Sequence, residues 1–183
     1  MPRVKRLAIV GRQNSGKTTL VEAMVRYWDA HNLHVGVIKH DGHLVADDAD
    51  DWEKPNSDTA RYQAAGAALS LLAGGGRSLL RMSRDAQATD VLGLCERLEA
   101  MAEENSRSLD VVLVEGFKAS ALPKLIVVRR MEDIAWLNEG QSAWSNVLAV
   151  VCPISLRHLV EVDVQVYDDS HIPLLCTDLW YRL

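Results

Sequence analysis

The feature that most constrains this chain is the stretch at residues 11–18, where Gly-x-x-x-x-Gly-Lys-Thr follows a short apolar run. Glycines let a backbone turn tightly and approach an anion without a Cβ in the way. Successive backbone N–H groups can then form an anion-binding nest, and a helix that starts there adds the positive end of its dipole. The pattern is typical of a loop that binds the phosphates of a nucleoside triphosphate.

The residues of this loop have separate expected roles. Lys17 is expected to reach the β- and γ-phosphates with its ammonium group, and Thr18 to bind Mg²⁺ through its hydroxyl. The backbone nest is expected to comprise Gly11, Asn14, Ser15 and Gly16. The flanking sequence supports this prediction, because the apolar run at residues 7–10 ends at the first glycine and helix-spaced apolar residues follow within 19–31.

Short apolar runs alternate with helical periodicity along the chain, which predicts an α/β fold. Residues 7–10 and 111–114 are continuously apolar, as strands buried on both faces of a parallel sheet are. Further strands are predicted at residues 35–38, 69–73, 78–82, 125–128, 147–151 and 164–167. Helices are predicted at residues 19–31, 60–68 and 91–101, with a last one near Pro173. The order predicts a single domain over residues 1–183, a three-layer P-loop NTPase fold with helices on both faces of an open, mostly parallel sheet.

A carboxylate stands where P-loop proteins commonly hold their metal. Glu115 directly follows the apolar run at residues 111–114, so it is expected at the C-terminal edge of the sheet, where ligands bind. An acidic residue at that point holds Mg²⁺ directly or through water. We therefore predict Thr18 and Glu115 as metal ligands, and Lys17 and Glu115 as the residues that support any catalysis.

Four more residues are candidates for the same edge of the sheet. Lys39 and His40 end the predicted second strand, where a cation could contact phosphate and an imidazole could orient a substrate. Gly116 and Lys118 follow the strand-end glutamate, and Lys118 either touches phosphate or a partner or lies exposed. All four are therefore predicted as part of the binding site.

Composition narrows the function classes. A net charge of −5 and a pI near 5.7 argue against DNA or RNA as the main partner, since nucleic-acid-binding domains are basic. No stretch approaches the ~20 apolar residues of a membrane span, and the first apolar run is too short for a signal peptide. Cys95, Cys152 and Cys176 form no CxxC pair and are expected to be buried free thiols. We expect a cytoplasmic protein with neither a nucleic-acid nor a membrane partner.

The preferred base is not fixed by the sequence. Many GTPases read guanine with Asn-Lys-x-Asp after a late strand, but the four residues after the run at 147–151 are Cys-Pro-Ile-Ser. Asp168, Asp169 and Asp178 are possible acceptors for the donor edge of guanine. No local pattern chooses among the three.

Four stretches together resemble the MobB family, the adapter proteins of molybdopterin-guanine dinucleotide biosynthesis. They are residues 10–19, residues 36–40 with His43, residues 58–61 running into 65–67, and residues 110–118 with Pro123 and Lys124. The Lys-His pair and the Val-Glu-Gly-Phe-Lys segment are together much more specific than the phosphate loop. The chain departs from the family at residues 55–59, which read Pro-Asn-Ser-Asp-Thr where the family often has Pro-Gly-Lys-Asp-Ser.

The resemblance implies a P-loop GTPase-like fold, binding of GTP and Mg²⁺, slow hydrolysis and a homodimer. It also implies a role beside the guanylyltransferase MobA, which joins GMP to molybdopterin. The implied phosphate and metal contacts are Gly16, Lys17 and Thr18, with Thr19 ending the matching loop and Glu115 as the strand-end acid. The implied residues around the phosphates or the cofactor are Lys39, His40, Asp58 and Arg61. Whether molybdopterin or molybdopterin-guanine dinucleotide binds this chain directly is left open.

Two other functions could use the same loop. A small-molecule kinase would carry a lid with arginines, and Arg77, Arg81 and Arg84 could form one. A metallochaperone GTPase would need a cluster of cysteine and histidine ligands, and His40 and His43 have no third such residue nearby. Phosphate transfer to an added acceptor would favour the kinase, and stoichiometric metal binding would favour the metallochaperone.

Overall fold

The computed structural model describes residues 3–40, 57–67, 69–82, 90–140 and 144–183. They belong to two compact units, one formed by residues 1–40 and 91–183 and the other by residues 41–90. Residues 41–55 are rich in acidic side chains and have few apolar ones, a composition that predicts a loop, and they lie outside the described residues. That both units form the single domain expected for residues 1–183 stays a prediction.

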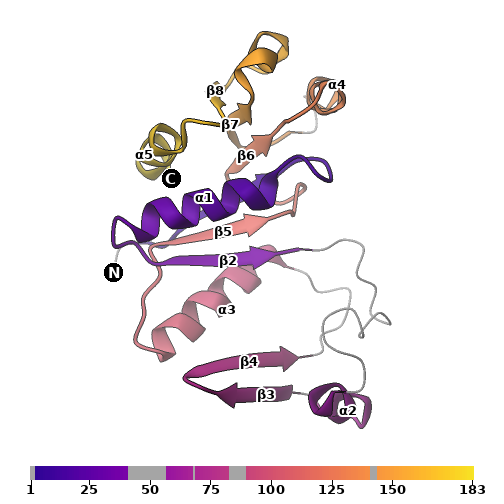
Figure 1. The fold of residues 1–183 in the computed structure, drawn as a ribbon, viewed down its shortest axis with the longest axis vertical. Helices are drawn as coiled ribbons and strands as arrows, with labels where there is room; N and C mark the ends of the chain where they lie inside the picture. The colour runs from indigo at the N-terminus through magenta and orange to yellow at the C-terminus, as the bar shows by residue number, and fades with distance from the viewer. Residues whose placement is uncertain (1–2, 41–56, 68, 83–89, 141–143) are drawn as a thin grey trace. The chain divides into compact units, whose positions relative to one another are not determined.

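The larger unit is built on a parallel sheet (Figure 1). Among the described residues it has six strands in the order β2-β5-β1-β6-β7-β8. Their bounds are β1 (Lys5–Val10), β2 (Val35–Lys39), β5 (Val111–Glu115), β6 (Lys124–Val127), β7 (Val147–Cys152) and β8 (Gln165–Asp168). Each pair of neighbouring strands is parallel, so the carboxyl ends of all six lie along one edge. The predicted open, parallel sheet is confirmed.

Helices cover both faces of this sheet, because successive side chains of a strand point to opposite sides. Leu7 and Ile9 of β1 pack on one face, together with buried side chains of α1 (Lys17–Asp29) and α5 (Ile172–Arg182). Ala8 and Val10 pack on the other face. The elements there are α3 (Val91–Glu104), α4 (Met131–Glu139) and the 3₁₀ helix η3 (Ile154–Leu159). Figure 1 shows α1 in front of the sheet and α3 behind it. The three-layer fold is confirmed.

Helix α4 was not predicted from the sequence, although its signals are present. Glu132 and Asp133 stand in its first turn, and Ile134 and Leu137 are buried at a spacing of three. Acidic residues at a helix start and apolar residues three apart are helix signals. With a length of nine residues, however, the helix is too short for its periodicity to stand out from the flanking loops.

The smaller unit contains α2 (Asp58–Ala64) and an antiparallel hairpin of β3 (Leu69–Gly74) and β4 (Arg77–Met82). The predicted strands are confirmed. The helix predicted at residues 60–68 begins two residues earlier and ends sooner, near Gly66, which has a φ of +99°. A glycine in this left-handed conformation is a common way to end a helix.

Two further expectations concern single residues and helix length. Cys95, Cys152 and Cys176 are buried and unbridged, as predicted. Within the described ranges, no helix combines the length and apolar character needed to cross a bilayer.

Candidate functional site

The candidate site lies at the carboxyl edge of the sheet, where β1 leads into the phosphate loop. The strand register explains how distant residues meet there. Glu115, the last residue of β5, is paired with Ile9 of β1 on one side and with Lys39 of β2 on the other. Because these strands are parallel, the loop after β1, the end of β2 and the end of β5 converge on one point.

The loop needs glycine at two positions for two different reasons. Gly16 has a φ of +88°, a backbone conformation that residues with a side chain adopt only under strain. A Cβ there would also lie 2.5 Å from Nη1 of Arg129. A Cβ on Gly11 would lie 2.6 Å from the carbonyl oxygen of Val127 and 2.5 Å from Oγ of Ser15. The carbonyl cannot move without disturbing β6. Gly16 is therefore required by its backbone conformation, and Gly11 by the close approach of β6.

Lys17 closes the loop on itself. Its Nζ donates hydrogen bonds to the carbonyl oxygens of Gly11, at 3.2 Å, and Arg12, at 2.7 Å. Burial lowers the pKa of this ammonium group, while the carboxylate of Glu115 counteracts the shift. The N-terminus of α1, the positive end of its dipole, has the ammonium group of Lys17 beside it and no acidic residue in its first turn. This is a favourable environment for an anion.

Thr18, Glu115 and Lys39 form a connected polar cluster. Thr18 Oγ1 lies 3.0 Å from each carboxylate oxygen of Glu115, so its single hydroxyl proton is shared between the two. Lys39 Nζ lies 3.1 Å from Oε1 of the same carboxylate. Glu115 is only 6% exposed, whereas the Lys39 side chain is 58% exposed. The structure therefore joins the hydroxyl and the carboxylate that were predicted as metal ligands.

The residues of this cluster suit a nucleotide phosphate and Mg²⁺. Ser15 Oγ is buried in the loop and has no hydrogen-bond partner in the described part of the chain. Buried polar atoms are normally hydrogen-bonded, so this hydroxyl has capacity to bind a ligand at the loop. A hydroxyl oxygen and a carboxylate are the ligand types that Mg²⁺ takes from proteins, alongside phosphate oxygens and water. These observations fit the predicted ligand chemistry.

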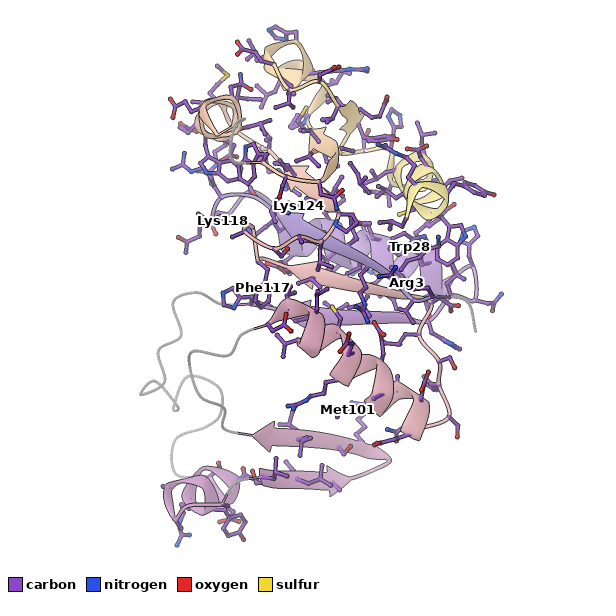
Figure 2. The ribbon with its side chains drawn as sticks, turned by 180° about the vertical axis from the view of Figure 1, so that it is seen from behind. Arg3, Trp28, Met101, Phe117, Lys118 and Lys124 are labelled. Atoms are coloured by element: carbon purple, nitrogen blue, oxygen red, sulfur yellow. The ribbon has the colours of Figure 1, made fainter. Side chains whose placement is uncertain are left out.

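His40 and the residues after Glu115 border the cluster. The backbone N–H of His40 donates to the carbonyl oxygen of Glu115, and its ring stacks on Phe117 with centroids 4.3 Å apart. Gly116 donates its N–H to Ile9, which ties this turn to β1. Lys118 is exposed, at the start of the loop that Figure 2 shows between β5 and Lys124. The predicted residues of β2 and β5 thus lie together at the loop.

Asp58 and Arg61 belong to the smaller unit. They lie in the first turn and the middle of α2, and their side chains form an exposed ion pair at 3.7 Å. Their role around the phosphates or a cofactor stays a prediction. His43 lies outside the described residues.

Sequence reasoning missed the residues that hold the loop from the side of β6. Arg12 Nη1 donates to the carbonyl oxygen of Glu132, and Arg130 Nη2 donates to that of Asn14. The buried carboxylate of Asp133 accepts the backbone N–H groups of Arg129 and Arg130. The pair of arginines directly after an apolar strand was the available signal, since it places two cations at the ligand-binding edge.

No group of three or more histidine, cysteine, aspartate or glutamate side chains that could hold a metal occurs among the described residues. The Cys/His cluster of a metallochaperone is not present among those residues.

Comparisons with known proteins agree on one family. The family model for MobB, described as molybdopterin guanine dinucleotide synthesis protein B, matches residues 6–153. A probable molybdopterin-guanine dinucleotide biosynthesis adapter protein of Bacillus subtilis is 31% identical over 143 residues, which is 78% of this chain and 73% of that protein. The adapter protein of Haemophilus influenzae is 29% identical over 168 residues, covering 91% of this chain and 83% of its own length.

Solved structures show the same fold. The crystal structure of Bacillus subtilis MobB superposes with a TM-score of 0.69 at 25% identity and covers 98% of both chains. HypB from Helicobacter pylori, solved in complex with nickel, has a TM-score of 0.55 at 11% identity, covering 98% of this chain and 86% of its own. The second match shows a shared fold alone.

Proposed function

The chain belongs to the MobB family of adapter proteins in molybdopterin-guanine dinucleotide biosynthesis, and we propose that within this family it binds GTP with Mg²⁺ and assists a MobA-like guanylyltransferase. Weak hydrolysis of GTP is part of the proposal. Its three cysteines form no disulfide, which fits a protein of the reducing cytoplasm.

The single observation that carries the nucleotide part is the contact of Thr18 with Glu115 beside the glycine-lined loop. Backbone N–H groups of residues 11–16 would hold the phosphates, and Lys17 would exchange its two carbonyl partners for phosphate oxygens. Bound Mg²⁺ would neutralise charge on the β- and γ-phosphates, with Thr18 and Glu115 as its protein ligands.

Slow hydrolysis is proposed from the role given to the acidic group. As a ligand of Mg²⁺ beside Thr18, the carboxylate of Glu115 would be committed to the metal and would not be placed to orient an attacking water. This role is consistent with an adapter that holds GTP longer than it turns it over.

A homodimer is also proposed, on the evidence of the hairpin. Leu71 and Leu72 of β3 and Leu79 of β4 are 58–63% exposed. They lie on both faces of the two-stranded ribbon, so both faces present exposed leucines. An isolated two-stranded hairpin is marginally stable in water, and exposed leucines of this number mark an interaction surface. A second copy of the chain is the proposed partner, and the mass in solution by light scattering tests it.

The experiment that tests the nucleotide proposal is a calorimetric titration with non-hydrolysable GTP and ATP analogues, with and without Mg²⁺. We expect tighter, Mg²⁺-dependent binding of the GTP analogue. Lys17→Ala should weaken it about 10- to 100-fold, because one charge-assisted contact is worth about 1.5–3 kcal/mol. Lys5→Ala is the matched control, since Lys5 lies at the other end of β1 and contacts Trp180. Equal affinity in Lys17→Ala and wild type would refute the phosphate loop.

The same preparation tests the adapter role. Co-elution of the wild-type protein with a MobA-like guanylyltransferase is expected in size-exclusion chromatography, and its failure would remove that partner. A preference for the ATP analogue would instead redirect the search to phosphate acceptors and a kinase activity.

A further inference from the structure

A cavity of about 100 Å³ opens on the far side of the phosphate loop from Glu115. Its walls come from the start of α1 and from the ends of β6, β7 and β8, and they include the apolar side chains of Leu20, Val127 and Ile172. Its polar side chains are Ser15, Thr19, Arg129 and Asp169. Mainly apolar walls with a small number of polar groups are the usual lining of a small-molecule site.

The position of this cavity relative to the metal ligands suggests what enters it. In the sheet order, Lys39 and Glu115 lie on β2 and β5, to one side of β1, whereas Arg129 and Asp169 follow β6 and β8, to the other side. The proposed metal binds the β- and γ-phosphates on the first side. The nucleoside end of a triphosphate that lies along the loop therefore points to the second side, over the cavity.

The structure separates the three aspartates that the sequence left equivalent. Asp168 accepts hydrogen bonds from the backbone N–H and the hydroxyl of Ser170. Asp178 accepts from the hydroxyl of Tyr167 and from Arg182. Both of these carboxylates are thus engaged locally, and neither lines the cavity beside the loop.

Asp169 is different in both respects. It lines the cavity, its side chain is 37% exposed, and its charged neighbour is Arg129, with Nη2 3.8 Å from Oδ2. That distance is too long for a hydrogen bond, so it leaves room for the carboxylate to accept bonds from a ligand. The backbone of Asp169 is held by a hydrogen bond from its N–H to Cys152, so the side chain starts from a fixed point at the rim.

We propose that Asp169 selects guanine, accepting hydrogen bonds from N1–H and N2–H₂ of the base, with Arg129 beside it as the donor for O6. This inference rests on the proposed GTP binding. Guanine offers a carboxylate two neighbouring donors on this edge, whereas adenine offers only its N6 amino group beside an acceptor nitrogen. A pair of one acceptor group and one donor group therefore favours guanine by one charge-assisted hydrogen bond. The cavity holds only a few water volumes, so it takes an edge of the ring while the rest lies at the mouth.

The test exploits a change of base rather than a loss of binding. In Asp169→Asn the side-chain oxygen still accepts N1–H, but the new amide N–H₂ faces the N2–H₂ of guanine donor to donor. Xanthine carries an oxygen at that position. We expect the variant to bind GTP about 10- to 100-fold more weakly than wild type does. We expect it to bind XTP more tightly than wild type does, by a similar factor. Titrations with Mg²⁺ and GTP, XTP and ATP measure both changes.

Asp168→Asn is the matched control, because it removes the neighbouring carboxylate that is bound to Ser170, and it should leave the base preference unchanged. A gain of XTP binding cannot come from unfolding, so it supports the assignment directly. The assignment would be overturned if the wild type prefers GTP but Asp169→Asn loses affinity for GTP without gaining affinity for XTP. The proposed GTP binding of the wild type would still stand in that case. A wild-type protein that binds none of the three nucleotides would overturn the proposed function itself.

Discussion

Lys124 is the residue whose replacement we expect to reveal most about how the site is supported. It is the first residue of β6, and its side chain is completely buried. Its Nζ donates to the carbonyl oxygens of Ser120, Leu122 and Ser145, at 3.2 Å for Leu122 and 3.0 Å for Ser145. The ammonium group therefore ties the loop that follows β5 to the segment that precedes β7.

Two opposing terms decide the effect of Lys124→Met, which keeps an unbranched side chain and removes the charge. Hydrogen bonds to charged groups contribute about 1.5–3 kcal/mol each, but two of the three are only partly buried, so water can replace the ammonium there. The carbonyl of Leu122 would lose a fully buried bond. Removing the charge also relieves its desolvation, the effect that lowers the pKa of Lys124. The balance is a loss of about 2 kcal/mol in the free energy of unfolding.

Thermal unfolding measures this loss, which for a chain of this length corresponds to a fall in Tm of about 4–8 °C. Lys118→Met is the matched control, because it makes the same chemical change six positions earlier on an exposed side chain, and it should leave Tm within about a degree. An unchanged or higher Tm in Lys124→Met would show that the desolvation cost outweighs the three hydrogen bonds, and would refute the reasoning.

Two further predictions concern charged groups. Glu115→Gln should weaken GTP binding about 10- to 100-fold in the presence of Mg²⁺ and much less in its absence, since it removes a metal ligand and not a phosphate contact; equal losses in paired titrations would contradict the metal role. The hydrogen bond from Tyr167 lowers the pKa of Asp178, so its stabilising contribution is present above the ordinary carboxyl pKa and is lost as the pH falls. In urea unfolding at pH 7 and pH 3, Asp178→Asn should therefore lose less stability on acidification than wild type does, and an equal loss would speak against this pair.

The parts of the site that could be predicted from sequence are those encoded by contiguous residues. The loop is recognisable because glycine, lysine and threonine stand at a fixed spacing, and Glu115 because it ends an unbroken apolar run. Strand register then brings Lys39 to Glu115 without any further signal being needed. Local chemistry and parallel topology together were sufficient for this half of the site.

The other half depends on contacts that a sequence does not encode locally. Asp168 and Asp169 are adjacent and identical in type. Only the structure shows that Asp168 accepts hydrogen bonds from Ser170, whereas Asp169 lines the cavity. Lys124 would be expected at the surface, as lysines almost always are, and its burial follows from three carbonyls that converge from two loops. Such features arise from tertiary packing, so they appear only with the structure.

The contact between Lys39 and Glu115 has a consequence for how the site is loaded. A buried carboxylate needs a positive partner in every state, and in the structure that partner is an ammonium group on a mostly exposed side chain. In the proposed GTP complex, Mg²⁺ would replace Lys39 beside Glu115, so loading would exchange one cation for another rather than fill an empty place. Lys39 would then turn toward solvent at the end of β2, and the loaded and unloaded forms would present different surface charge to a protein that meets this edge of the sheet.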